Sequence, residues 1–179
     1  TAAFLVSVIN DLLNNPIQEQ RFRGEPRALI LAPTRELALQ IESDAQALTK
    51  FSNLHLVTLL GGVDFDKLKK MLDSNFVDII VATPGRLIDL IERNAINIKE
   101  TPLLVLDEAD EMVSILKDSL DTIIAELPKK HQTYLFTATL PGTIKQLIQK
   151  YLNKNVEQVS ANMEIMGNQG IDHKYIIVD

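Results

Sequence analysis

Residues 103–110 read LLVLDEAD, so four apolar residues are followed by three carboxylates within four positions. A short run of Leu and Val is typical of a buried parallel strand. Such a strand would deliver Asp107 and Glu108 to its carboxyl end, where open parallel sheets bind their ligands. Mg²⁺ keeps several of its waters and takes one or two carboxylates, so Asp107 could hold this ion through water. Glu108 could then orient or deprotonate an attacking water.

The acidic run has two other readings. Asp and Glu are favoured at any helix N-terminus by the helix dipole, so the run could be purely structural. Asp107, Glu108 and Asp110 could also be ligands in a two-metal phosphodiesterase. That reading lacks a second acidic cluster, and the three histidines are isolated in the sequence.

Short apolar runs alternate with longer helical patterns along the whole chain, which predicts the elements that position these residues. We expect strands at 27–32, 55–60, 77–82, 103–106, 133–137 and 156–160, and a last one at 174–178. We expect helices at 1–13, 35–50, 65–72, 86–93 and 143–151, and one long helix from the acidic residues to about 127. Repeated alternation of strand and helix indicates an α/β fold with a parallel sheet and helices on both faces.

Four further polar motifs follow expected strands, where a parallel sheet would gather them at one edge. They are PTRE at 33–36, GG at 61–62, TPGR at 83–86 and TAT at 137–139. Free amides at helix N-termini bind phosphate without net positive charge, and Arg35 and Arg86 add local cations. Gly61 and Gly62 would let a sugar-phosphate backbone approach closely. Such contacts read the backbone and not the bases, so binding would not depend on nucleotide sequence.

Each of these motifs also has a structural reading. Thr34 could cap a helix, and the paired glycines could form a turn. Thr83 and Pro84 could be a cap followed by proline at the first helical position. The TAT residues could be an ordinary strand end.

Taken together and in order, these motifs resemble those of the DEAD-box RNA helicases, in their first RecA-like domain. The resemblance rests on APTRELA (32–38), GG, TPGR, DEAD (107–110) and TAT. It implies a RecA-like, P-loop NTPase-type fold in three layers, ATP and Mg²⁺ as cofactors, and RNA-dependent ATP hydrolysis coupled to local duplex unwinding. Asp107 and Glu108 would then serve magnesium and the hydrolytic water, and Asp110, Thr137 and Thr139 would connect that site to RNA.

The resemblance also implies which residues contact the RNA backbone: Pro33, Thr34, Arg35, Glu36, Gly61, Gly62, Thr83, Pro84, Gly85 and Arg86. Two places depart from the family pattern. Thr137 stands where the usual motif begins with Ser, which keeps the hydroxyl. Ile115 and Leu116 stand near the usual Gly-Phe pair, which suggests a divergent helix there.

No glycine of this chain precedes a lysine, so the phosphate-binding pattern GxxxxGK[ST] is absent from it. Residues 1–4, TAAF, resemble the residues directly after Gly-Lys in the family, where Thr1 would be a magnesium and nucleotide ligand. We expect the loop and its strand in the parent protein. That strand is central in the family's sheet, so its absence should leave neighbouring ladder groups uncovered.

We therefore expect residues 1–160 to be the first RecA-like domain without its N-terminal strand and loop. Residues 161–179 would be a linker towards a second RecA-like domain, which is a further partner. The chain alone would be inactive. The alternative is a nucleotide-independent RNA-binding or scaffolding module, and a parent gene without Gly-Lys before Thr1 would favour it.

The 179-residue chain carries a net charge of -6 and contains no cysteine. An acidic chain does not favour nucleic acid as a whole, so any RNA site must be local. The lack of cysteine excludes thiolate metal sites and fits a cytoplasmic protein. No apolar run reaches the roughly 20 residues that a membrane span needs, so we expect no membrane association.

Overall fold

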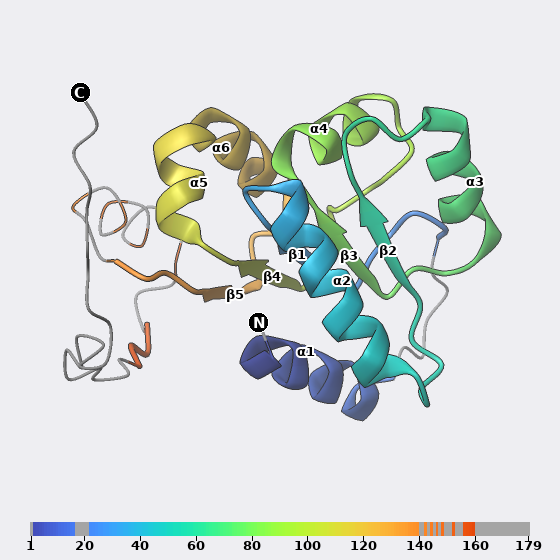
Figure 1. Cartoon of the computed structure of the whole chain (residues 1–179), viewed down its shortest axis with the longest axis horizontal. Coiled ribbons are helices and arrows are strands. Elements are labelled where there is room, and N and C mark those ends of the chain that lie inside the picture. Colours follow the sequence, from blue (N-terminus) through green and yellow to red (C-terminus); the bar gives the residue numbers. More distant parts are fainter. Residues whose placement is uncertain are drawn as a thin grey trace, which may run out of the picture.

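The computed structural model describes residues 2–16, 22–139, 142, 144, 146, 148, 152 and 156–159. In these residues the elements are α1 (Ala2–Asn14), β1 (Ala28–Leu31), α2 (Arg35–Thr49), β2 (Leu56–Leu59), α3 (Phe65–Ser74), β3 (Ile79–Ala82), α4 (Pro84–Glu92), β4 (Leu103–Leu106), α5 (Ala109–Ile115), α6 (Lys117–Glu126) and β5 (Gln132–Leu135). The five strands form one parallel sheet in the order β2-β3-β1-β4-β5 (Figure 1).

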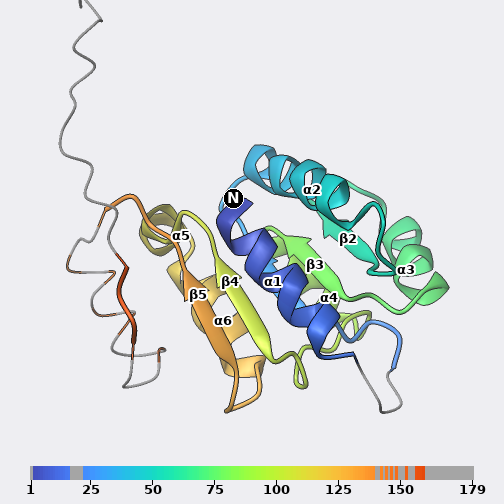
Figure 2. The ribbon, with the colours of Figure 1, turned by 90° about the horizontal axis from the view of Figure 1, so that it is seen from below.

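Alternate residues of the strands point to opposite faces of the sheet, and each face is covered by helices. In β1, Leu29 and Leu31 pack in one apolar cluster with residues of α3, α4, α5 and α6. Ala28 and Ile30 pack in a second cluster with α1 and α2. Figure 2 shows α1 and α2 on the near side of the sheet, with α4 and α6 behind it. The expected three-layer α/β fold is confirmed.

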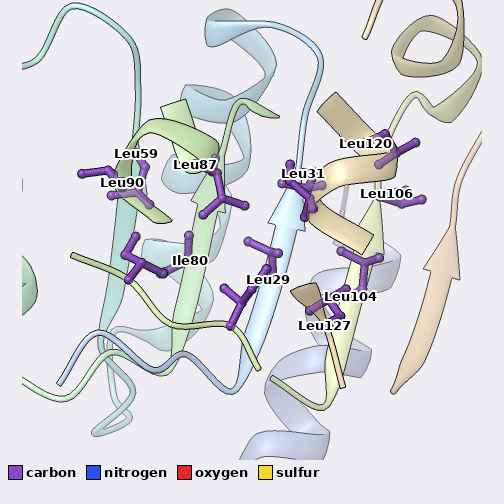
Figure 3. Packing of buried hydrophobic residues seen from close by; sticks show 14 of the residues in the cluster. Leu29, Leu31, Leu59, Ile80, Leu87, Leu90, Leu104, Leu106, Leu120 and Leu127 are labelled. Carbon is purple, nitrogen blue, oxygen red and sulfur yellow. The ribbon is translucent and has the colours of Figure 1, made fainter. Parts of the chain in front are cut away.

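The central strands are buried on both faces, which is why they read as unbroken apolar runs. Figure 3 shows Leu87 and Leu90 of α4 directed at Leu59 and Ile80 of the neighbouring strands. Each leucine removed from water in this way contributes about 2 kcal/mol before entropic costs. This packing fixes the start of α4 relative to the ends of β2 and β3.

A buried ion pair fastens the amino-terminal edge of the sheet, opposite the motifs. Arg27 Nη1 lies 3.5 Å from Asp78 Oδ1, and both side chains are about nine-tenths buried. Arg27 also donates to the carbonyls of Leu12 and Asn15, at the end of α1. Asp78 Oδ2 accepts from the His55 amide at 2.9 Å. The pair therefore ties α1 to the entrances of three strands.

The single long helix expected after the acidic residues is wrong, because the structure has two helices that meet at Leu116. Leu116 adopts φ -125° and ψ 25°, and its amide donates to Met112 at the end of α5. The break lets α5 bury Val113 while α6 buries Leu120 and Ile123.

One other expectation differs from the structure. Residues 156–159 are not in a strand, so the strand expected at 156–160 is wrong over its described part. Among the described residues β5 pairs with β4 alone, at the edge of the sheet, and its residues are exposed or partly buried, so the expectation of uncovered ladder groups stays a prediction. Residues 142, 144, 146 and 148 are helical, as expected for that segment. No helix in the described residues is long and apolar enough to cross a membrane.

Candidate functional site

The five motifs lie at one edge of the molecule, because every strand that precedes them is parallel to the next. The acidic run follows β4, and the TAT run follows β5. PTRE, GG and TPGR follow β1, β2 and β3 (Figure 1). The two groups meet in the middle of the sheet, where β1 and β4 are neighbours.

Asp107 is held by the backbone of the strand ends. Its amide donates to the Leu31 carbonyl at 3.1 Å, which extends the pairing of β4 with β1 by one residue. Its Oδ1 atom accepts the Glu108 amide at 3.1 Å. Burial raises the pKa of Asp107, and the hydrogen bond from Glu108 partly offsets that rise.

Glu108 adopts a left-handed backbone conformation, with φ 50° and ψ 51°, immediately before α5. This region is uncommon for residues other than glycine and costs about 1–3 kcal/mol, and such strain clusters at functional sites. Its side chain is exposed. The pKa of Glu108 is raised, first by partial loss of water and then by hydrogen bonding and charge repulsion from Glu111. The sequence pattern gave no signal for this conformation.

The acidic motif and the TAT motif are joined by backbone and side-chain bonds. Ala109 donates from its amide to Phe136 at 2.9 Å. Thr139 donates from Oγ1 to Asp110 Oδ2 at 2.6 Å, and Thr137 donates from its hydroxyl to the Thr139 carbonyl at 2.6 Å. The hydrogen bond from Thr139 is the main reason that the pKa of Asp110 is lowered.

The donor set at the end of β4 fits Mg²⁺ held largely by water. Asp107 and Glu108 offer two adjacent carboxylates, which suits an ion that takes one or two protein ligands. Among the described residues, no three His, Asp or Glu side chains gather closely enough to hold a metal on their own. This arrangement gives no support to the two-metal reading. Thr1, the other expected metal ligand, lies outside the described residues.

Thr34 caps α2, so the structural reading of this residue is confirmed. Its hydroxyl accepts the Leu37 amide at 3.3 Å. Arg35, the first residue of the helix, extends to the next motif and donates to the Gly61 carbonyl. Gly62 has φ 80°, and a Cβ atom there would lie 3.0 Å from Arg35 Nη1. The PTRE and GG motifs therefore form one unit, and the positive φ favours glycine at position 62.

The TPGR motif lies at the start of α4, with Pro84 at the first helical position. This is the structural role that we considered for the motif. Thr83 stands at the N-cap without a side-chain capping bond. Gly85 is exposed, and a Cβ atom there would meet nothing within 4 Å. Arg86 turns back to the GG loop, where Nη2 donates to the Val63 carbonyl at 2.7 Å.

The ion pairs around Arg86 were not predicted from the sequence, although the spacing of the charged residues indicates them. Asp89 bridges Arg86 and Arg93, which are three and four residues away on α4. Positions three and four apart share a helix face, so the alternation of charges could have indicated this network.

The sequence profile of the DEAD/DEAH box helicase family matches residues 1–147, which is most of the chain. The chain belongs to the DEAD/DEAH box helicase family. The resemblance carried by the five motifs is thereby confirmed. Among curated relatives, the ATP-dependent RNA helicase RhlB of Pseudomonas aeruginosa is 47% identical over 154 residues, covering 84% of this chain and 39% of the relative. RhlB of Yersinia pestis is 43% identical over 163 residues, covering 89% of this chain and 37% of the relative.

A solved structure of the same family shares the fold. The yeast DEAD-box splicing factor Prp28 superposes with a TM-score of 0.75 and 31% identity, covering 88% of this chain and 39% of that protein. The chain thus spans about two fifths of the length of the curated relatives and of this structure.

Proposed function

We propose that this chain is the first half of an ATP-dependent RNA helicase, which hydrolyses ATP when RNA is bound and uses the cycle to separate short RNA duplexes. The observation that carries the proposal is the Asp107–Glu108 pair at the end of β4, bonded through Ala109 and Asp110 to the TAT segment. Family membership and relatives described as ATP-dependent RNA helicases support it.

The two carboxylates have different roles in this proposal. Asp107 would hold Mg²⁺ through water, and Mg²⁺ would offset negative charge on the ATP phosphates. Glu108 accepts the proton of the attacking water. Its carboxylate is exposed, so that water can reach it, and its raised pKa makes it a better proton acceptor than an ordinary glutamate.

Asp110, Thr137 and Thr139 link hydrolysis to RNA. The Thr139–Asp110 hydrogen bond joins the ends of β4 and β5, so a change at the acidic residues would shift the TAT segment. The RNA backbone would lie along the other motifs, in contact with Pro33, Thr34, Arg35, Glu36, Gly61, Gly62, Thr83, Pro84, Gly85 and Arg86.

In this proposal, the phosphate loop and the second RecA-like domain belong to the parent protein. Residues 1–160 form the first RecA-like domain, whose phosphate loop precedes Thr1. Residues 161–179, outside the described residues, lead to a second RecA-like domain. The isolated chain is inactive without those parts, and the parent protein works in the cytoplasm.

Phosphate release from ATP by the parent protein, with and without single-stranded RNA, tests the proposal. We expect RNA to stimulate release, and Glu108→Gln to abolish it. Glu100→Gln is the matched control, because Glu100 is an exposed glutamate just before the amino end of β4. RNA binding without any hydrolysis by the unaltered protein would contradict the enzyme and leave a nucleotide-independent binding module.

A further inference from the structure

Residues 61–64, which we call the GG turn, are held from two sides by arginines of two different helices. Arg35 of α2 donates to the Gly61 carbonyl, and Arg86 of α4 donates to the Val63 carbonyl at 2.7 Å. Val63 itself packs against both apolar clusters of the protein. The peptide planes of this turn are therefore fixed by side chains that lie far from it in the sequence.

A carbonyl lies in one peptide plane with the amide of the next residue, so Arg35 fixes the Gly62 amide and Arg86 fixes the Asp64 amide. In the part of the chain that the structure describes, the amides of Gly61, Gly62, Val63 and Asp64 donate to no other residue. Successive unbonded amides in a turn with a left-handed residue form a concave donor surface for an anion such as a phosphodiester, and Gly62 is such a residue with φ 80°. The arginines thus act on this turn through its backbone, and its donors remain available to a ligand.

Arg86 depends in turn on Asp89. The Arg86 side chain is only 13% exposed, and its buried Nε atom has no hydrogen-bond partner. Its charge is balanced by Asp89, whose Oδ2 accepts from Nη1. A mostly buried guanidinium without its carboxylate would leave an uncompensated charge, which proteins avoid by moving the side chain towards water.

Asp89 is itself fixed by a third cation. Arg93 donates from Nε to Asp89 Oδ1 at 2.7 Å, and its guanidinium lies 4.8 Å from the centre of the Phe65 ring. Phe65 begins α3, two residues after Val63. The charged residues of α4 therefore contact both the first residue of α3, through Phe65, and the GG turn directly before it, through Val63.

We infer that Asp89 is a positioning residue for RNA binding. It contacts no RNA; it holds Arg86 on the Val63 carbonyl and so keeps the amides of the GG turn arranged for a phosphate. The inference rests on the proposed function, because it assumes that this turn meets the RNA backbone.

Charge alone and positioning predict opposite results for Asp89→Asn. This substitution removes one negative charge close to a bound polyanion, so Coulomb's law alone would strengthen RNA binding. Loss of positioning would weaken it, because Arg86 is released from the turn. The direction of the change therefore separates the two effects.

The test is fluorescence anisotropy of labelled oligouridylate RNA with the parent protein, Mg²⁺ and a nonhydrolysable ATP analogue. We expect Asp89→Asn to weaken binding about fivefold, as for residues coupled in one ion-pair network. Asp73→Asn is the matched control, since it makes the same charge change in an exposed Lys69–Asp73 pair and should leave binding unchanged or slightly tighter. In an Arg86→Gln background, Asp89→Asn should cause no further loss.

A second variant keeps the test decisive if Asp89→Asn does not fold. Arg93→Lys retains the charge of a half-exposed side chain but loses the planar group that bonds Asp89 and stacks on Phe65. We expect it to weaken RNA binding about twofold without lowering the melting temperature. Unchanged or tighter binding by Asp89→Asn, or by Arg93→Lys where only that variant folds, would overturn the inference. Failure of the unaltered protein to bind RNA would overturn the proposed function instead.

Discussion

Thr139 donates a hydrogen bond to Asp110, with 2.6 Å between Oγ1 and Oδ2, across 29 positions of sequence. Asp110 lies in the first turn of α5, and Thr139 follows β5. Because the two strands are neighbours, this bond joins the proposed hydrolytic carboxylates to the segment proposed to respond to RNA.

Removing the Thr139 hydroxyl should raise the pKa of Asp110. The hydrogen bond is the main cause of the lowered pKa, so Thr139→Val should move it towards the ordinary value of 3.8. Carboxyl-carbon NMR titration measures the change, with Thr139→Ser as the control that keeps the hydroxyl. An unchanged pKa of Asp110 in Thr139→Val would show that this hydrogen bond does not lower the pKa.

The same bond predicts a dependence of stability on pH. A carboxyl whose pKa is lower in the folded state contributes stability that is present above its unfolded pKa and is lost as the pH falls through its folded pKa. Thr139→Val should therefore be less stable than the unaltered protein at pH 7, by an amount that shrinks below about pH 3.8. Urea unfolding across this range measures the difference.

Glu108 should be a site where glycine is favoured over alanine for stability. Its φ of 50° strains any residue with a Cβ atom, and glycine relieves that strain. We expect Glu108→Gly to be about 1 kcal/mol more stable than Glu108→Ala in urea unfolding, although both should lack hydrolysis. Equal stabilities of the two variants would argue against the left-handed conformation.

The ion pair between Arg27 and Asp78 should matter more for stability than an exposed pair. Arg27→Met leaves Asp78 buried without this partner, which costs about 3–5 kcal/mol in comparable pairs. Lys69→Met breaks the exposed Lys69–Asp73 pair and should cost under about 1 kcal/mol. Similar losses for the two variants in urea unfolding would contradict the buried network.

Gly85 offers a direct test of the RNA surface, because its substitution should not harm the fold. An added Cβ atom meets nothing within 4 Å, and alanine restricts the unfolded chain more than glycine does. Gly85→Ala should therefore leave the melting temperature unchanged or slightly higher, and it should weaken RNA binding because the added methyl group stands between the RNA backbone and the start of α4. Unchanged RNA affinity would remove Gly85 from the proposed contacts.

The fold was largely predictable because strands buried on both faces leave an unmistakable apolar run, as in residues 103–106. The start of α2 was equally readable, because Thr34 makes the capping bond that its type suggests. Local sequence carries both signals, and tertiary packing reinforces them.

Other features depend on contacts between distant residues and were not predictable. The break at Leu116 arises because α5 and α6 both pack on the sheet. The directions of Arg35 and Arg86 depend on where the GG turn lies, so the sequence predicted cations but not their carbonyl partners. The backbone of Glu108 is fixed by the junction of β4 with α5, for which no residue pattern is diagnostic.

Displacement of a short RNA duplex by the parent protein tests the central claim most directly, because it requires RNA binding, ATP hydrolysis and their coupling together. We predict strand release that needs ATP and Mg²⁺, that is lost in Glu108→Gln, and that persists in Glu100→Gln. Strand release that proceeds equally without ATP, or in Glu108→Gln, would contradict the account.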